Sequence, residues 1–107
     1  MPTINIDAEV ISVNIANKKV NKVDRKVTKV VLGAWRIDEK INDVVNTEMK
    51  MNIEGVVLPV LVKKLTIGTK RVDKHLTSRY YKLELDYNGV DDNLGRFVMQ
   101  EVDVELT

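Results

Sequence analysis

The sequence contains no cysteine and one histidine among its 107 residues. Without cysteine, the chain has no disulfide framework, no thiol nucleophile and no cysteine-ligated metal. A single histidine also excludes a zinc site built from several histidines. His75 follows Asp73 in a predicted exposed loop, and no nucleophile signature accompanies it. The sequence therefore predicts a protein that is not an enzyme and holds no cofactor or metal.

Long hydrophobic runs are also missing. The longest uncharged apolar stretch, residues 55–62, has eight residues, whereas a membrane-spanning helix needs about 20. The first ten residues include Asp7 and Glu9 and lack the basic start and apolar block of a targeting signal. We therefore expect a cytoplasmic protein with no membrane partner, located in the host cytoplasm if its source is a virus.

The chain also lacks a large excess of one charge, because it has 17 Lys and Arg residues and 16 Asp and Glu residues. This near balance excludes a strongly basic, histone-like binder. The charges are nonetheless segregated along the chain. Residues 18–29 hold six basic residues and one acid, residues 63–82 hold seven basic residues and one acid, and residues 84–105 hold seven acids and one base. The acidic pair Asp91 and Asp92 does not match the spacing of an EF-hand loop, so we predict an ordinary acidic turn there.

The choice of apolar residues favours strands over helices. The chain has 18 valines and 8 isoleucines against 3 alanines and 9 leucines. β-branched side chains suit a pleated sheet, whereas alanine and leucine lead the helix scale. With 44% hydrophobic residues, the composition predicts one mainly β domain spanning residues 1–107.

Alternation of apolar and polar residues locates five predicted strands, at residues 4–15, 27–37, 47–53, 79–87 and 98–106. In the first strand, the apolar set changes parity between Val10 and Ile11, which predicts a β-bulge or a bend. The second is apolar on both parities, as in a strand covered on both sides. The last two strands are predicted to form a hairpin across the turn at Asn88-Gly89, with four of their side chains in the core: Leu83, Leu85, Val102 and Val104.

The connecting segments leave one ambiguity. Residues 16–26 and 38–43 are predicted loops, the second with a helical turn that Asp38 could cap. In residues 54–69, Pro59 could begin a short helix, whereas the valines favour a strand. We favour a short helix or an irregular crossover. Five strands with a helix between the third and fourth have the order of an OB-like barrel; a small β-sandwich or a simple meander fits the same pattern.

The basic stretches, as loops on a barrel, would track a phosphate backbone, and an aromatic side chain beside them would stack on a base. Parity places Tyr81 in the core and Tyr80 outward, and Trp35 is predicted to fill the core. The predicted nucleic-acid-binding residues are Lys18, Lys19, Arg25, Lys26, Arg71, Arg79, Tyr80 and Lys82. The competing interpretation is that these loops are merely solvated or that they pair with the acidic stretch.

Two functions remain open. The first is a small module that binds single-stranded DNA or RNA without sequence preference, such as an accessory protein of a phage or mobile element. The alternative is a non-catalytic interaction or structural module, such as a virion component or an inhibitor of a host protein. We also expect self-association, because an open sheet leaves strand edges and the acidic Glu101, Asp103 and Glu105 could meet a basic stretch of another copy.

Overall fold

The chain is mainly β, as its composition predicts. The computed structural model describes residues 3–91 and 93–107, and these residues form six strands, one helical turn and one turn of 3₁₀ helix. In chain order the elements are β1 (Ile4–Val20), β2 (Val23–Ala34), α1 (Ile41–Val44), β3 (Glu48–Ile53), β4 (Val56–Asp73), β5 (Leu76–Tyr87), η1 (Leu94–Phe97) and β6 (Glu101–Leu106).

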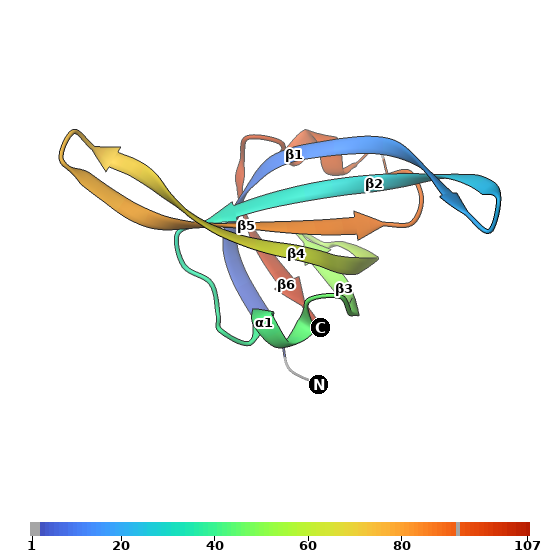
Figure 1. Ribbon diagram of the computed structural model, residues 1–107, viewed down its shortest axis with the longest axis horizontal. Helices are drawn as coiled ribbons and strands as arrows, with labels where there is room; N and C mark the ends of the chain where they lie inside the picture. The colour runs from blue at the N-terminus through green and yellow to red at the C-terminus, as the bar shows by residue number, and fades with distance from the viewer. Residues whose placement is uncertain (1–2, 92) are drawn as a thin grey trace.

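The six strands close into an antiparallel barrel in the order β1-β2-β5-β4-β3-β6 (Figure 1). The first half of β1 pairs with β6 and its second half pairs with β2. The register shifts between Val10 and Ser12, so the predicted bulge lies where the apolar side chains change parity. Because the barrel is closed, its body has no open edge, whereas free edges remain beyond it, where β1 pairs with β2 alone and β4 pairs with β5 alone.

The ambiguous segment is a strand, not a helix. The sequence predicts five strands, and β4 is the additional one. Pro59 is tolerated because it lies opposite Lys50 of β3, just before the β4–β5 pairing begins at Val60, where a strand residue can lack a backbone donor. The helical turn predicted within residues 38–43 is present as α1, between β2 and β3, but its N-cap residue is Lys40 and no side chain caps it. Asp38 accepts a hydrogen bond there from the backbone N–H of Lys40 (3.0 Å).

The last two strands do not form the predicted hairpin. β6 pairs with β1 and β3, because the chain after β5 crosses one end of the barrel through η1, whose Leu94 and Phe97 are buried. The four predicted core side chains are nevertheless buried, at 4% exposure or less. Alternation therefore identifies the inward face of each strand without identifying its neighbour.

Two hairpins extend beyond the barrel as two-stranded arms, one made by β1 and β2 and the other by β4 and β5 (Figure 1). They project from opposite ends of a molecule about 50 Å long. The β1–β2 arm turns at Asn21 and Lys22, which both have positive φ (51° and 64°), as in the type I′ turns that join hairpin strands. Residues 16–26 are thus not the predicted loop, because an arm exposed on both faces lacks an alternating apolar pattern.

Candidate functional site

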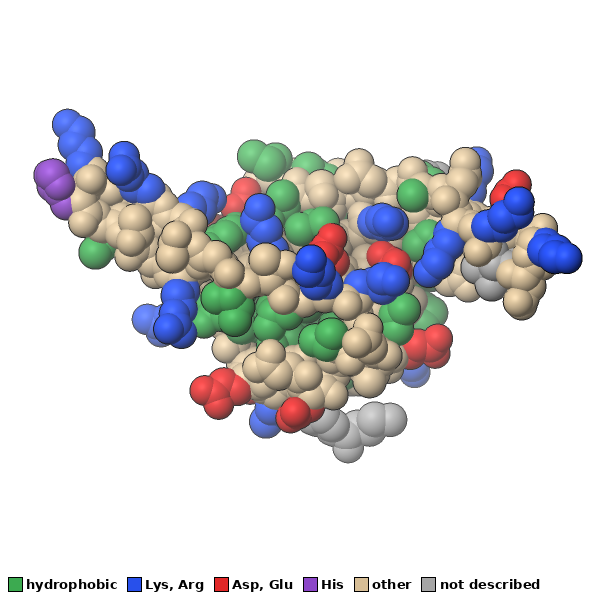
Figure 2. All heavy atoms as spheres, in the orientation of Figure 1, with side chains coloured by type: hydrophobic (Ala, Val, Ile, Leu, Met, Phe, Trp, Pro, Cys, Tyr) green, Lys and Arg blue, Asp and Glu red, His purple; other side chains and the backbone are tan. Residues whose placement is uncertain are grey.

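A row of basic side chains lies on the outward face of the sheet formed by β1, β2, β5 and β4. The register places Lys29 opposite Asp86, Lys64 opposite Glu84, and Lys82 opposite Gly33. These positions alternate with buried neighbours such as Val30 and Leu83 and therefore point outward. We call the exposed row the basic band: Lys18, Arg25, Lys29, Lys64, Lys70 and Lys82. Figure 2 shows Lys and Arg side chains along this face from one arm to the other.

The structure divides the residues that the sequence groups into one site. Lys18 and Arg25, which lie directly opposite each other on the β1–β2 arm, belong to the basic band, as does Lys82. By alternation, Lys19 and Lys26 lie on the other face of the β1–β2 arm. Arg71 and Arg79 likewise lie on the other face of the β4–β5 arm. The two predicted basic loops therefore do not meet.

Three members of the basic band, Lys29, Lys64 and Lys70, are absent from the set predicted from the sequence. They connect the two arms across the barrel. Lys64 points outward because the register of β4 shifts between Val62 and Lys64. The adjacent lysines at 63 and 64 give no indication of this shift, so only the strand pairing reveals which of them joins the band.

The predicted exposures of two aromatic residues are wrong. Tyr80 is 7% exposed and Trp35 is 44% exposed. Parity does place Tyr80 on the outward face, but the edge of the Trp35 ring covers it, with ring centroids 4.8 Å apart at 67°. The ring of Tyr80 is also covered by Lys70, whose Nζ lies 4.7 Å from its centroid. Trp35, rather than Tyr80, therefore offers an accessible ring.

Gly33 provides the space in which Tyr80 lies. A Cβ atom at Gly33 would lie 2.7 Å from Cζ of Tyr80 and 2.7 Å from Cδ1 of Ile11. The tyrosine is thus held between a strand backbone and an indole ring. Burial, with a smaller contribution from the Glu9 carboxylate, raises the pKa of the Tyr80 hydroxyl above its ordinary value.

Trp35, Tyr80 and Lys70 form an aromatic cluster within the basic band. The Lys70 Nζ is 5.7 Å from the centroid of the Trp35 ring, within the range of a cation–π interaction. Beside the cluster is a surface hollow of about 430 Å³, lined by Glu9, Ile11, Thr69, Lys70, Tyr80, Lys82 and Met99. The cluster combines an exposed flat ring with the ammonium group of Lys70, and Lys82 lines the hollow beside it. This is the chemistry needed to stack a base and neutralise its phosphate. A smaller hollow next to Trp35 and Tyr80 is lined by the acids Asp7, Glu9 and Glu101.

The basic band also includes acidic neighbours. Glu84 and Asp86 lie among Lys29, Lys63 and Lys64, around a hollow of about 390 Å³. Glu9 also lines the hollow beside Lys70 and Lys82. Three acids therefore lie against the six Lys and Arg of the band, which leaves the band positive. The band therefore provides an electrostatic path along the molecule rather than a uniformly basic surface.

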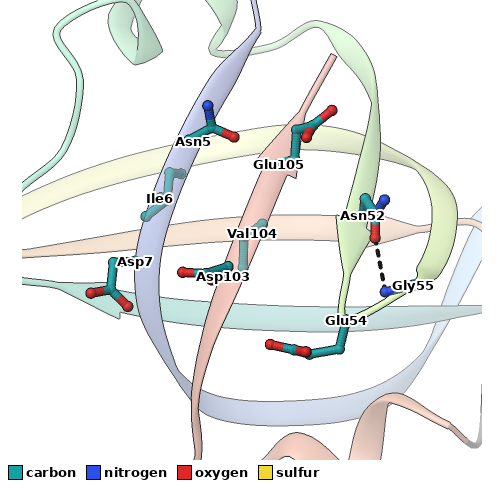
Figure 3. A pocket seen from close by; sticks show the side chains of 9 residues that line it. All are labelled: Asn5, Ile6, Asp7, Asn52, Glu54, Gly55, Asp103, Val104 and Glu105. Atoms are coloured by element: carbon teal, nitrogen blue, oxygen red, sulfur yellow. Dashed lines mark hydrogen bonds between the residues drawn. The ribbon is translucent and has the colours of Figure 1, made fainter.

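The other side of the barrel, formed by β3, β6 and the first half of β1, is acidic. Asp7 lies directly opposite Asp103, and Glu9 lies directly opposite Glu101. Glu105 lies opposite Asn5 and Asn52. We call this surface the acidic face: Asp7, Glu9, Glu54, Glu101, Asp103 and Glu105. It contains a hollow of about 570 Å³, in which Figure 3 shows Asp7, Asp103, Glu105 and Glu54 from β1, β6 and the β3–β4 turn.

Replacing one member of a like-charge pair should stabilise the fold. Asp103→Asn is expected to raise the free energy of unfolding by about 0.2–1 kcal/mol, because like charges directly opposite each other in neighbouring strands repel. Urea denaturation measures this change. The matched control is Glu84→Gln, which removes a charge opposite Lys64 and should give no gain. A lower stability for Asp103→Asn would contradict the expected repulsion.

Other candidate chemistry has no geometric support. Over residues 3–91 and 93–107, no group of three or more His, Cys, Asp or Glu side chains could hold a metal ion. His75 lies in the exposed turn of the β4–β5 arm. Asp92 of the predicted acidic turn lies outside the described residues, while Asp91 accepts a hydrogen bond from the backbone N–H of Asn93 (2.7 Å).

Comparisons with known proteins add no assignment. No family model matches the sequence, and no curated protein or solved structure matches it. Within the described part of the chain, no helix has the length and apolar character required to cross a membrane.

Proposed function

We propose that the protein binds single-stranded nucleic acid without sequence preference, along the basic band. The observation that carries this proposal is the continuity of the band. Six exposed Lys and Arg side chains share one sheet face and extend from the β1–β2 arm across the barrel to the β4–β5 arm. Each is a donor for a phosphate oxygen, and each contact would release counterions.

The aromatic cluster supports a single strand rather than a duplex as the ligand. A base can stack on the exposed ring of Trp35 only if it is unstacked from its own neighbours. Lys70 then lies beside it to meet a flanking phosphate, and Lys82 lines the adjoining hollow. Barrels that bind single strands in this way cover about 4–16 nucleotides, and the 50 Å length of this molecule suits an extended strand.

A salt titration should distinguish the contribution of phosphate contacts to the binding affinity from the contribution of base stacking. Lys82→Gln is expected to weaken binding to all sequences alike. It should reduce the slope of log affinity against log salt by about 0.7, the value for one phosphate contact on a single strand. Trp35→Ala should cost about 1–3 kcal/mol with little change in slope, because stacking releases few ions. Fluorescence anisotropy of a labelled oligothymidylate over a series of salt concentrations measures both quantities.

Lys50→Gln serves as the matched control. Lys50 is an exposed lysine of β3 outside the basic band, so its loss should leave the slope unchanged. Equal effects of Lys82→Gln and Lys50→Gln would show that binding does not use the band. If the wild-type protein binds no oligonucleotide even at low salt, the proposal is wrong.

A further inference from the structure

The acidic face has charges that the barrel itself does not neutralise. Its outward positions bring Asp7 against Asp103 and Glu9 against Glu101. On the described outward positions of β3, β6 and the first half of β1, Lys50 is the one basic side chain. In a monomer, these like-charged pairs repel each other and lower the stability of the fold. A cationic partner would convert that repulsion into attraction.

The shape of the acidic face restricts the partner. Its hollow of about 570 Å³ is within the roughly 300–1,000 Å³ of ligand-sized sites. Six of the nine residues that line the hollow are Asn, Asp or Glu, with amide oxygens from Asn5 and Asn52 next to the carboxylates (Figure 3). The Asn52 side chain also accepts a hydrogen bond from the backbone N–H of Gly55 (3.0 Å), which fixes the turn at one end of the hollow. Such a lining suits lysine and arginine side chains.

The β1–β2 arm of this same chain has the complementary chemistry. Between residues 17 and 27 it has five basic residues and one acid, Asp24. Lys18 and Arg25 lie on one face of the arm, Lys19 and Lys26 lie on the other, and Lys22 is in the turn. The arm therefore presents positive charge on every side. It projects beyond the barrel (Figure 1), and an isolated two-stranded ribbon is only marginally stable in water, so a partner surface would stabilise it.

We propose that the β1–β2 arm of one copy binds the acidic face of a second copy. The contact joins two different surfaces, so it is either heterologous or made twice in a symmetric dimer whose copies exchange arms. The β4–β5 arm is the poorer match. It has four basic residues where the β1–β2 arm has five. It also exposes three large apolar side chains, Ile67, Val72 and Leu76, where the β1–β2 arm exposes two among its described side chains, Ile15 and Val23. This inference goes beyond the proposed function and does not require it.

Two variants with complementary defects test the contact. The arm variant combines Lys19→Gln, Lys22→Asn and Lys26→Gln, where asparagine tolerates the positive φ of residue 22. The face variant combines Asp7→Asn, Asp103→Asn and Glu105→Gln. Circular dichroism establishes that each variant retains the β fold. Sedimentation velocity at low salt then measures the mass of the wild-type protein, of each variant and of an equimolar mixture.

The wild-type protein should associate at low salt and dissociate at high salt. Each variant alone should be monomeric, because it lacks one of the two surfaces. The mixture should give a 1:1 dimer, because the intact arm of the face variant can bind the intact face of the arm variant. This recovery from two defective chains is specific to a contact between an arm of one copy and the acidic face of another.

The β4–β5 arm supplies a matched control. Arg71→Gln, Lys74→Gln and Arg79→Gln together remove three positive charges from the other arm and should leave association intact. A wild-type protein that remains monomeric at low salt, or a mixture that remains monomeric, would overturn the proposal. Equal loss of association in the two arm variants would also overturn it, because the effect would then depend on charge and not on the arm.

Discussion

Leu85→Ala is expected to lower the free energy of unfolding by about 2–5 kcal/mol, the range for truncating a fully packed leucine. Leu85 is 0% exposed and lies in β5, with β2 on one side and β4 on the other. Its cross-strand neighbours are Val30 and Val62, both buried. The strands of a closed barrel are held by hydrogen bonds on both sides, so they cannot collapse readily into the space that the substitution leaves.

Ile67→Ala is the matched control for this prediction. Ile67 is 58% exposed on the β4–β5 arm, and surface substitutions of this kind usually change stability by about 0.5 kcal/mol or less. Urea denaturation should therefore shift the midpoint strongly for Leu85→Ala and weakly for Ile67→Ala. An unchanged midpoint for Leu85→Ala would mean that the inward face of β5 is misassigned.

Gly33→Ala is expected to destabilise the protein by about 1–3 kcal/mol, the usual effect of overpacking. The added methyl group would occupy the position of the Tyr80 ring and would press on Ile11. Tyr80 cannot turn away freely, because Trp35 and Lys70 cover its outer side. The substitution should therefore displace Tyr80 together with Trp35 and Lys70. A change in tryptophan fluorescence would report the displacement, and the denaturation midpoint would report the loss of stability.

Gly68→Ala separates the steric effect from the general effect of adding a methyl group to a strand. Gly68 lies opposite Tyr80 on β4, but nothing lies within 4 Å of a Cβ atom built there. Its substitution should be neutral or slightly stabilising. In addition, Tyr80→Ala combined with Gly33→Ala should lose less stability than the sum of the two single changes. Strict additivity would show that Gly33 and Tyr80 do not compete for space.

The strands that form the barrel could be predicted from the sequence because one of their faces is buried. Met49, Met51 and Ile53 are inward in β3, as their spacing indicates. Ile4, Ile6, Ala8 and Val10 are inward in β1. A buried face imposes a period of two on the apolar residues, and the bulge at Ile11 appears in the sequence as a change of phase.

The arms and the strand order could not be predicted in this way. On an arm both faces meet water, so the residues from Asn14 to Lys26 show no alternation that would distinguish a strand from a loop. The position of β6 between β1 and β3 depends on how the chain from Asn88 to Gln100 covers the barrel end. That is a long-range packing outcome, and turn residues such as Asn88 and Gly89 carry no information about it.

The candidate site was predictable in its charge and not in its geometry. The sequence reveals that positive charge is concentrated in two stretches. It does not reveal which members of each stretch share a face, because a one-residue register shift reverses the outcome. The exposure of Trp35 could not be predicted from the sequence either, because it depends on Tyr80 occupying the space above Gly33.

Strand β1 contains parts of both charged surfaces, with Asp7 and Glu9 before the bulge at Ile11 and Lys18 after it. This arrangement separates positive from negative charge across the molecule, although its formal net charge is +1. The net charge alone would attract a distant polyanion only weakly, but the field of the polyanion would exert a torque that turns the basic band toward it. The molecule would thus be oriented before contact. The orienting torque would weaken as added salt shortens the range of the electric field.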